Sequence, residues 1–314
     1  MTAAVPEKMA TPPSVTRLVD RLLAMWPEHE GFVATSLGGH GKGELDLLDI
    51  LSARILRLAG IDLDRFIESY RWLCGVFNEE QLYFVRNGRY RCSNFAEVNA
   101  AVYSNAEFMR KYMEGLLVSQ LFWQNHARSF IFFNEFIKTA VPDYRYLEVG
   151  PGHGLYLASV AADSDCAEAE AWDVSAESLA QTRASLSRMG VERPVTLVEQ
   201  DVQASTLDLE RRFDIVVISE VLEHLEAPLD ALNTLAAALA PAGRILVNFP
   251  INSPAPDHIY LLESLEQVVQ LVEQAGLVVE RAEAFPSMGY SLKRAMAVKA
   301  TVSCAVVARL GTER

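Results

Sequence analysis

The stretch that most constrains the fold of this 314-residue chain is YLEVGPGHG, at residues 146–154. The apolar residues up to Val149 are typical of a buried parallel strand, and residues 155–162 are typical of the helix that follows. Three alternating glycines let the backbone approach a ligand closely: Gly150, Gly152 and Gly154. Ligands of open α/β sheets bind at the carboxyl ends of strands, so this stretch predicts a strand-to-helix binding crevice.

The residues around the glycines indicate which ligand is bound. The dinucleotide fingerprint needs a small residue at position 155, where this chain has Leu155. Glu148, two residues before the first glycine, would repel a pyrophosphate and suits a cationic ligand such as S-adenosylmethionine. At this point the sequence resembles the class I S-adenosylmethionine-dependent methyltransferases, whose first motif is an acid followed by G-x-G-x-G.

Three later strand ends extend this resemblance. Residues 169–173 are predicted to be a strand ending on Asp173, roughly 20 residues after the glycines, where nucleotide folds place a ribose-hydroxyl acceptor. The strand at 195–202 ends on Asp201 and Val202, and the resemblance implies that Asp201 faces the adenine amine. A fourth strand, 213–220, carries Ser219 to the donor site. Residues 221–225 resemble the motif that borders the donor methyl.

The implied catalytic fold is α/β, a seven-stranded Rossmann-like sheet over residues 143–314, with later strands at 244–249, 277–282 and 301–308. A chain of this length exceeds the roughly 100 to 200 residues of one domain, so we expect two domains. Residues 1–13 are predicted to be a flexible tail. Residues 105–142 are predicted to be connecting helices rich in aromatic side chains.

Residues 14–104 are predicted to be a mainly helical domain with a wing. One helix is predicted to end at Gly60 and another to begin near Asp62. Asn87 and Gly88 are flanked by β-rich arms over residues 81–92, which predicts a hairpin. This layout resembles the winged-helix dimerisation domain of small-molecule O-methyltransferases from natural-product pathways, which implies a homodimer.

Charge and cysteine usage exclude some partners. The net charge of -13 argues against nucleic acid and against a membrane surface. Residues 62–92 carry as many acids as bases, a poor footprint for DNA. A non-enzymatic winged-helix regulator that senses S-adenosylmethionine and binds DNA is the rival hypothesis, and this charge balance disfavours it. Four cysteines without C-x-x-C spacing favour a cytoplasmic location.

The acceptor is predicted to be a small molecule, and oxygen is the first expectation for the methylated atom. A hydroxyl acceptor needs a base, and histidine titrates near neutral pH. His224 follows the fourth motif, although the resembled enzymes have His-Asp-Trp where this chain has His224-Leu225-Glu226. His258, in the irregular loop 250–260, is the second candidate. C-methylation of a 2-oxo acid or similar acidic carbon, and N-methylation, remain open.

Several further residues are predicted to line the acceptor pocket. Glu220 follows the fourth strand, Asp257 and Tyr260 lie in the loop, and Tyr290 lies in a candidate flap at 286–298. Trp123 and His126 are on the connecting helices, where a core role is favoured for His126. His224, His258, Glu220 and Asp257 could together approach a metal, but their spacing gives no direct support, so no metal is predicted.

Overall fold

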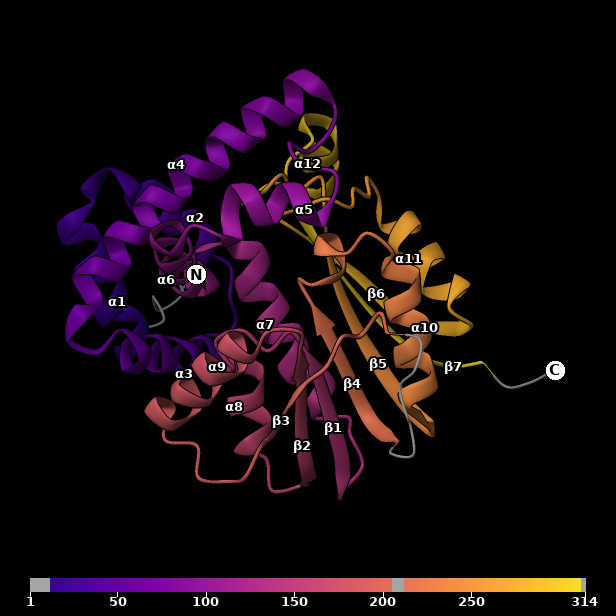
Figure 1. The fold of residues 1–314 in the computed structure, drawn as a ribbon. Helices are drawn as coiled ribbons and strands as arrows, with labels where there is room; N and C mark the ends of the chain where they lie inside the picture. Colours follow the sequence, from indigo (N-terminus) through magenta and orange to yellow (C-terminus); the bar gives the residue numbers. More distant parts are fainter. Residues whose placement is uncertain (1–11, 205–211, 312–314) are drawn as a thin grey trace, which may run out of the picture.

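The computed structural model describes residues 12–204 and 212–311. It contains a seven-stranded sheet in the order β3-β2-β1-β4-β5-β7-β6 (Figure 1). The pairs from β3 to β5 are parallel, and β7 runs antiparallel between β5 and β6. The strands are β1 Tyr144–Val149, β2 Cys166–Asp173, β3 Thr196–Glu199, β4 Phe213–Ser219, β5 Leu239–Ile251, β6 Leu277–Pro286 and β7 Val302–Leu310. The predicted seven-stranded Rossmann-like sheet is confirmed.

Alternate residues of the central strands face opposite sides of the sheet, and both sides are covered. Tyr146 of β1 belongs to one apolar cluster and its neighbour Leu147 to the other. The first cluster lies under α7, α8 and α9, and the second under α10 and α11 (Figure 1). These helices are α7 Gln124–Ile137, α8 Leu155–Ala161, α9 Ala176–Met189, α10 Pro228–Ala238 and α11 Leu265–Gln274. Burial on both faces explains why these strands read as continuous apolar runs.

The chain before the sheet is helical. Its elements are α1 Pro13–Met25, α2 Glu30–Leu37, α3 Lys42–Ala59, α4 Leu63–Asn87, α5 Phe95–Val98, the π-helical turn Asn99–Tyr103 and α6 Ala106–Phe122. The predicted helix end at Gly60 and the helix start near Asp62 are both found. The tail predicted for residues 1–13 lies outside the described residues up to position 11, and α1 already begins at Pro13.

The predicted hairpin over residues 81–92 is wrong. Helix α4 continues to Asn87, and Gly88 ends it in the left-handed conformation with φ 67°. The Gly88 amide donates to the Phe84 carbonyl at 2.8 Å, which closes the last turn. Asn-Gly is a hairpin signal and equally a helix C-terminus signal, and here it ends a helix whose last turn carries the buried Phe84. The described residues therefore form no wing at this position.

The N-terminal helices share one core with the sheet. Leu18, Leu51 and Ile55 belong to the same apolar cluster as Tyr146 and Leu157. At the joint, Arg54 donates to the Leu155 carbonyl at 2.9 Å, and Arg57 donates to the Met189 carbonyl at 2.7 Å. The dimerisation role predicted for this region stays a prediction.

Residues 287–301 join β6 to β7 and contain α12, Leu292–Val298. Within the described residues, no helix combines the length and apolarity needed to span a membrane.

Candidate functional site: a glycine turn beside a buried acid and histidine cluster

The predicted donor turn has the backbone that its glycines allow. Gly150, Gly152 and Gly154 have φ of 67°, 50° and 69°, in the left-handed region. A Cβ at Gly150 would lie 2.5 Å from Cγ2 of Val221, so the turn packs tightly against the segment after β4. A Cβ at Gly152 would meet nothing within 4 Å. The turn is thus closed on one side and open to a ligand on the other.

The carboxyl ends of the neighbouring strands bring the other predicted donor residues to the same edge of the sheet. Asp173 ends β2 in register with Glu199 of β3, is half-buried, and accepts a hydrogen bond from the Ser175 amide at 2.9 Å. Burial raises its pKa. Asp201 is exposed, Val202 is buried, and Ser219 ends β4. This edge fits a nucleoside that carries a positive charge. The accessible backbone at Gly152 leaves room for the ligand, and the carboxylates of Asp173 and Asp201 can accept its hydrogen bonds.

Val174 was missed by the sequence analysis. It follows Asp173 at the carboxyl end of β2 and is 68% exposed, so its side chain is accessible at the edge where the donor is expected. An apolar residue directly after the strand-end acid is the signal that could have found it.

Glu148 lies beneath the turn. It is buried, accepts a hydrogen bond from the Tyr146 hydroxyl at 3.0 Å, and is bonded by the Leu157 backbone. Burial raises its pKa to about 8. A carboxyl that is largely neutral at pH 7 is a weak counter-ion, so this geometry favours support of the turn. Its direct contact with the donor stays a prediction.

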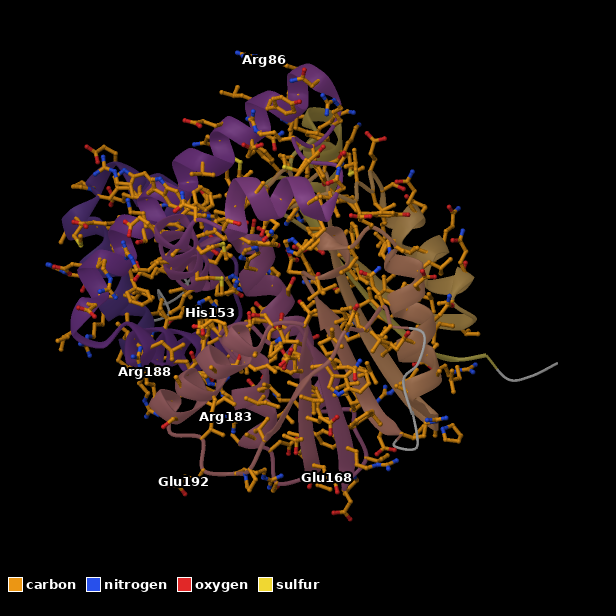
Figure 2. The ribbon with its side chains drawn as sticks, viewed as in Figure 1. Arg86, His153, Glu168, Arg183, Arg188 and Glu192 are labelled. Carbon is orange, nitrogen blue, oxygen red and sulfur yellow. The ribbon has the colours of Figure 1, made fainter. Side chains whose placement is uncertain are left out.

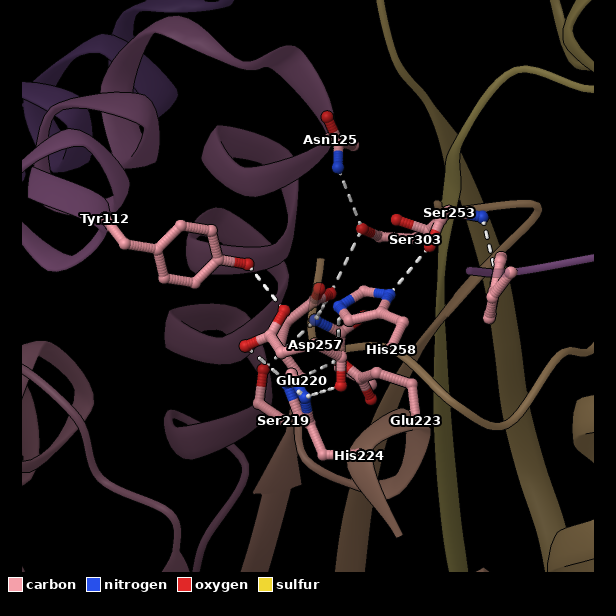
Figure 3. Close-up of polar contacts among 12 residues, drawn as sticks. Tyr112, Asn125, Ser219, Glu220, Glu223, His224, Ser253, Asp257, His258 and Ser303 are labelled. Atoms are coloured by element: carbon pink, nitrogen blue, oxygen red, sulfur yellow. Dashed lines mark hydrogen bonds and ion pairs between the residues drawn. The ribbon is translucent and has the colours of Figure 1, made fainter. Parts of the chain in front are cut away.

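The segment after β4 begins with a strained residue. Glu220 has φ 55°, a left-handed conformation that costs free energy for a side chain of this kind. Two hydrogen bonds hold its carboxylate, from Asn248 Nδ2 at 3.0 Å and from the Ser303 hydroxyl at 3.3 Å. Asn125 of α7 donates in turn to Ser303 at 3.1 Å (Figure 3). These contacts fix the direction in which the following residues enter the site.

Glu223 is fully buried, and neither of its carboxylate oxygens has a hydrogen-bond partner within the described residues. Its Oε1 lies 3.8 Å from Nε2 of His224 and 3.8 Å from Nε2 of His258. Burial, and then repulsion from Glu220, raises its pKa well above the usual range. An unpartnered buried carboxyl group destabilises the folded state unless something compensates it.

The two histidines meet although 33 residues separate them in the chain. Their ring centroids are 4.8 Å apart, and the rings are nearly perpendicular. Nδ1 of His224 donates to the Asp257 carbonyl at 3.0 Å, and Nδ1 of His258 donates to the Ser253 carbonyl at 2.7 Å (Figure 3). A carbonyl can only accept, so each ring carries a proton on Nδ1 and turns its Nε2 toward Glu223.

Glu223, His224 and His258 therefore form a candidate metal site, with ligand atoms all within 4.8 Å of one another. Metal-binding histidines commonly donate the other ring N–H to a backbone carbonyl, as both do here. Burial lowers the pKa of His258 to about 3, which keeps this imidazole neutral, the form that binds metals. The sequence analysis paired the histidines with Glu220 and Asp257 and missed Glu223. The signal was the run Glu220-x-x-Glu223-His224, one helical turn long.

The remaining predicted acceptor residues are distributed unevenly. Asp257 is buried beside His224, and the Tyr260 amide donates to the Glu223 carbonyl at 3.0 Å. His126 is buried, is bonded by Ser119 at 3.1 Å, and packs on Trp123. Burial lowers its pKa to about 4, consistent with the core role favoured for it. Tyr290 precedes α12 in the predicted flap, where its amide donates to the Ser287 carbonyl at 3.2 Å.

The strand order, the glycine turn and the strand-end acids together define an S-adenosylmethionine-dependent methyltransferase of the class I fold. Residues 107–283 match the Methyltransferase domain family, and since this is more than half of the chain, the protein belongs to that family. It carries a methyltransferase domain, and the glycine turn with its strand-end acids fits S-adenosylmethionine as the donor.

Curated relatives match a smaller part of the chain. It is 24% identical over 130 residues to the ubiquinone biosynthesis O-methyltransferase of Vibrio cholerae, covering 41% of this chain and 51% of that protein. The enzyme of the same name from Proteus mirabilis is 27% identical over 128 residues, covering 41% and 50%. The chain thus spans about half the length of the curated relatives it matches.

Solved structures align over more of the chain but at lower sequence identity. A putative methyltransferase from Bacillus halodurans aligns with a TM-score of 0.45 and 14% identity, covering 57% of this chain and 99% of that one. A putative sarcosine dimethylglycine methyltransferase from Galdieria sulphuraria aligns with a TM-score of 0.47 and 13% identity, covering 60% and 86%. Neither similarity bears on the acceptor.

Proposed function

We propose that this protein is an O-methyltransferase for a small-molecule hydroxyl and that Glu223, His224 and His258 hold a divalent metal ion beside the donor. The observation that carries the proposal is Glu223, which is fully buried, has no hydrogen-bond partner for either oxygen within the described residues, and places Oε1 3.8 Å from Nε2 of each histidine. Two imidazoles and one carboxylate are a donor set that zinc and similar ions accept with positions left open for a substrate. This proposal replaces the expectation that no metal is bound.

Methyl transfer to oxygen needs an in-line approach of the nucleophile and the loss of one proton. A bound divalent ion supplies Lewis acidity, which lowers the pKa of a hydroxyl that approaches it. The protein's own contribution is position: Glu220 fixes the turn, and Asp257 and Ser253 orient the two rings. His224 has a quarter of its side chain exposed against 7% for His258, so the acceptor is expected to enter beside His224.

The matched relatives from Vibrio cholerae and Proteus mirabilis are O-methyltransferases, which supports oxygen as the acceptor atom. We infer nothing about the biosynthetic pathway of this protein from theirs. C-methylation of an acidic carbon also needs proton removal and stays an alternative, whereas N-methylation needs positioning alone. The rival DNA-binding regulator loses support, because residues 81–87 are helical and the expected wing is replaced by a helix end.

The experiment is a turnover assay with isotope-labelled donor, read by mass spectrometry, on hydroxyl, acidic-carbon and amine acceptors. Glu223→Gln, His224→Gln and His258→Gln should each lower kcat by about 10²- to 10⁴-fold while donor binding changes little. Glu114→Gln is the matched control, a buried glutamate bound to Arg65 and Arg110 on the N-terminal helices. Full kcat in all three site variants would reject the proposal and favour an amine acceptor aligned by position alone.

A further inference from the structure

Two tyrosines of the N-terminal helical region reach into the loop that carries His258. Tyr112 of α6 donates its hydroxyl to Oδ1 of Asp257 at 2.7 Å, and both side chains are buried. Tyr90, which follows α4, accepts a hydrogen bond from the Ser253 amide at 3.1 Å and is also buried. Each bond therefore joins the helical region to one residue of the loop over residues 250–260.

The residues that these tyrosines hold are the ones that orient the histidines. The Asp257 carbonyl accepts from Nδ1 of His224, and Oδ2 of Asp257 lies 3.6 Å from the same nitrogen. The Ser253 carbonyl accepts from Nδ1 of His258. Two parallel chains of contact result, one from Tyr112 through Asp257 to His224 and one from Tyr90 through Ser253 to His258.

We infer that Tyr112 and Tyr90 are positioning residues that keep His224 and His258 in the tautomer with a free Nε2. The inference rests on the proposed function for its consequence, since a free Nε2 is what a metal ligand needs. Neither tyrosine hydroxyl is bonded to a histidine nitrogen in the contacts above, so both act through the loop. The acceptor and metal site is then built jointly by the N-terminal helices and the sheet.

Other contacts of the same surface agree with this arrangement. The Phe95 amide donates to Oε1 of Glu226, two residues after His224, at 2.8 Å. Tyr90 also packs edge-on against the His258 ring, with centroids 6.0 Å apart. Asp257 contributes to a raised pKa of Tyr103, after burial, so a second tyrosine of the helical region faces the same carboxylate.

The test uses Tyr112→Phe and Tyr90→Phe in the full chain. Tyr144→Phe is the matched control, because its hydroxyl donates to Asp163 at 2.8 Å from an equally buried ring at the amino end of β1. Nitrogen-15 NMR of histidine-labelled, metal-free protein reports which ring nitrogen carries the proton. His224→Gln and His258→Gln identify the two sets of signals.

We expect the wild type and Tyr144→Phe to hold both rings with the proton on Nδ1. Tyr112→Phe should shift His224 toward a mixture of tautomers, and Tyr90→Phe should do so for His258. In calorimetry, the Mn²⁺ concentration at half-saturation should rise about 10- to 100-fold in both variants, while the affinity for S-adenosylmethionine should not change. Tautomers unchanged in both variants would overturn the inference.

Failure of metal binding and failure of the positioning role give different results. If the wild type binds no metal and the tautomers still shift in the variants, the positioning role stands and the metal part of the proposed function fails. If the wild type binds Mn²⁺ but the variants keep both wild-type tautomers and wild-type affinity, only the positioning role fails.

Discussion

The residues of the site are organised by burial of groups that prefer water. Glu148 and Glu223 are buried and Glu220 is half-buried, all near the carboxyl ends of β1 and β4, and burial raises the pKa of each. Glu148 and Glu220 have hydrogen-bond donors, whereas Glu223 has none within the described residues. That difference separates carboxyls that support a turn from one poised to bind a cation.

The raised pKa of Glu148 predicts a pH-dependent stability. Between its unfolded value near 4.5 and its folded value of about 8, the unfolded chain loses a proton that the folded chain keeps. Stability contributed by this group is therefore full below pH 4.5 and falls as pH rises toward 8, by about 1.4 kcal/mol per pH unit. Glu148→Gln should remove that slope in urea unfolding at pH 5, 6.5 and 8, measured on metal-free protein. The exposed Glu177→Gln is the control. If the free energy of unfolding depends on pH in the same way in Glu148→Gln and wild type, the assignment of this slope to Glu148 is contradicted.

Asp173 tests the donor site. Its carboxylate is half-buried at the end of β2, where it is expected to accept hydrogen bonds from two donor hydroxyls. Asp173→Ala should weaken S-adenosylmethionine binding by roughly 1.5 to 3 kcal/mol in calorimetry. Asp230→Ala, on the exposed side of α10, should bind as the wild type does. Unchanged affinity in folded Asp173→Ala protein would remove this residue from the site.

At the scale of elements, the helix end at Gly88 decides how the N-terminal region is built. Gly88 caps α4 in a left-handed conformation, while Gly75 lies inside the same helix, exposed, with nothing within 4 Å of a new Cβ. Gly75→Ala should stabilise the protein by about 0.5 to 1 kcal/mol, because alanine costs less backbone entropy in a helix.

Gly88→Ala should instead destabilise the protein by about 1 kcal/mol, because alanine is strained at this φ. Both values are free energies of unfolding from urea titration. Effects of the same sign at the two positions would contradict the cap.

Most of the catalytic elements were predictable because their signals are local. The strand ends at Val149, Asp173 and Ser219 follow from apolar runs closed by glycine or an acid. The hairpin was wrong because Asn-Gly ends helices as well as joining strands. The contact between Glu223 and His258 was not predictable. The loop after β5 brings them together, and the number of residues between them gives no sign of this contact.

At the scale of the whole molecule, one apolar cluster joins the N-terminal helices to the sheet. Such a shared core predicts a single cooperative unfolding transition. Variants that retain only Trp26, on the N-terminal side, or only Trp172, on β2, report the two parts separately by fluorescence. Their urea midpoints should coincide. Midpoints clearly apart would show two independent domains.

The central claim is that Glu223, His224 and His258 hold a metal that the reaction needs. The most direct measurement is turnover of an accepted hydroxyl substrate by protein stripped with a chelator and then titrated with Zn²⁺, Mn²⁺ or Mg²⁺, with metal content measured in parallel. We predict that stripping lowers kcat by at least about 10²-fold, that one equivalent of a divalent ion restores it, and that Glu223→Gln protein is not restored. Full turnover by stripped protein that contains no metal would contradict the account.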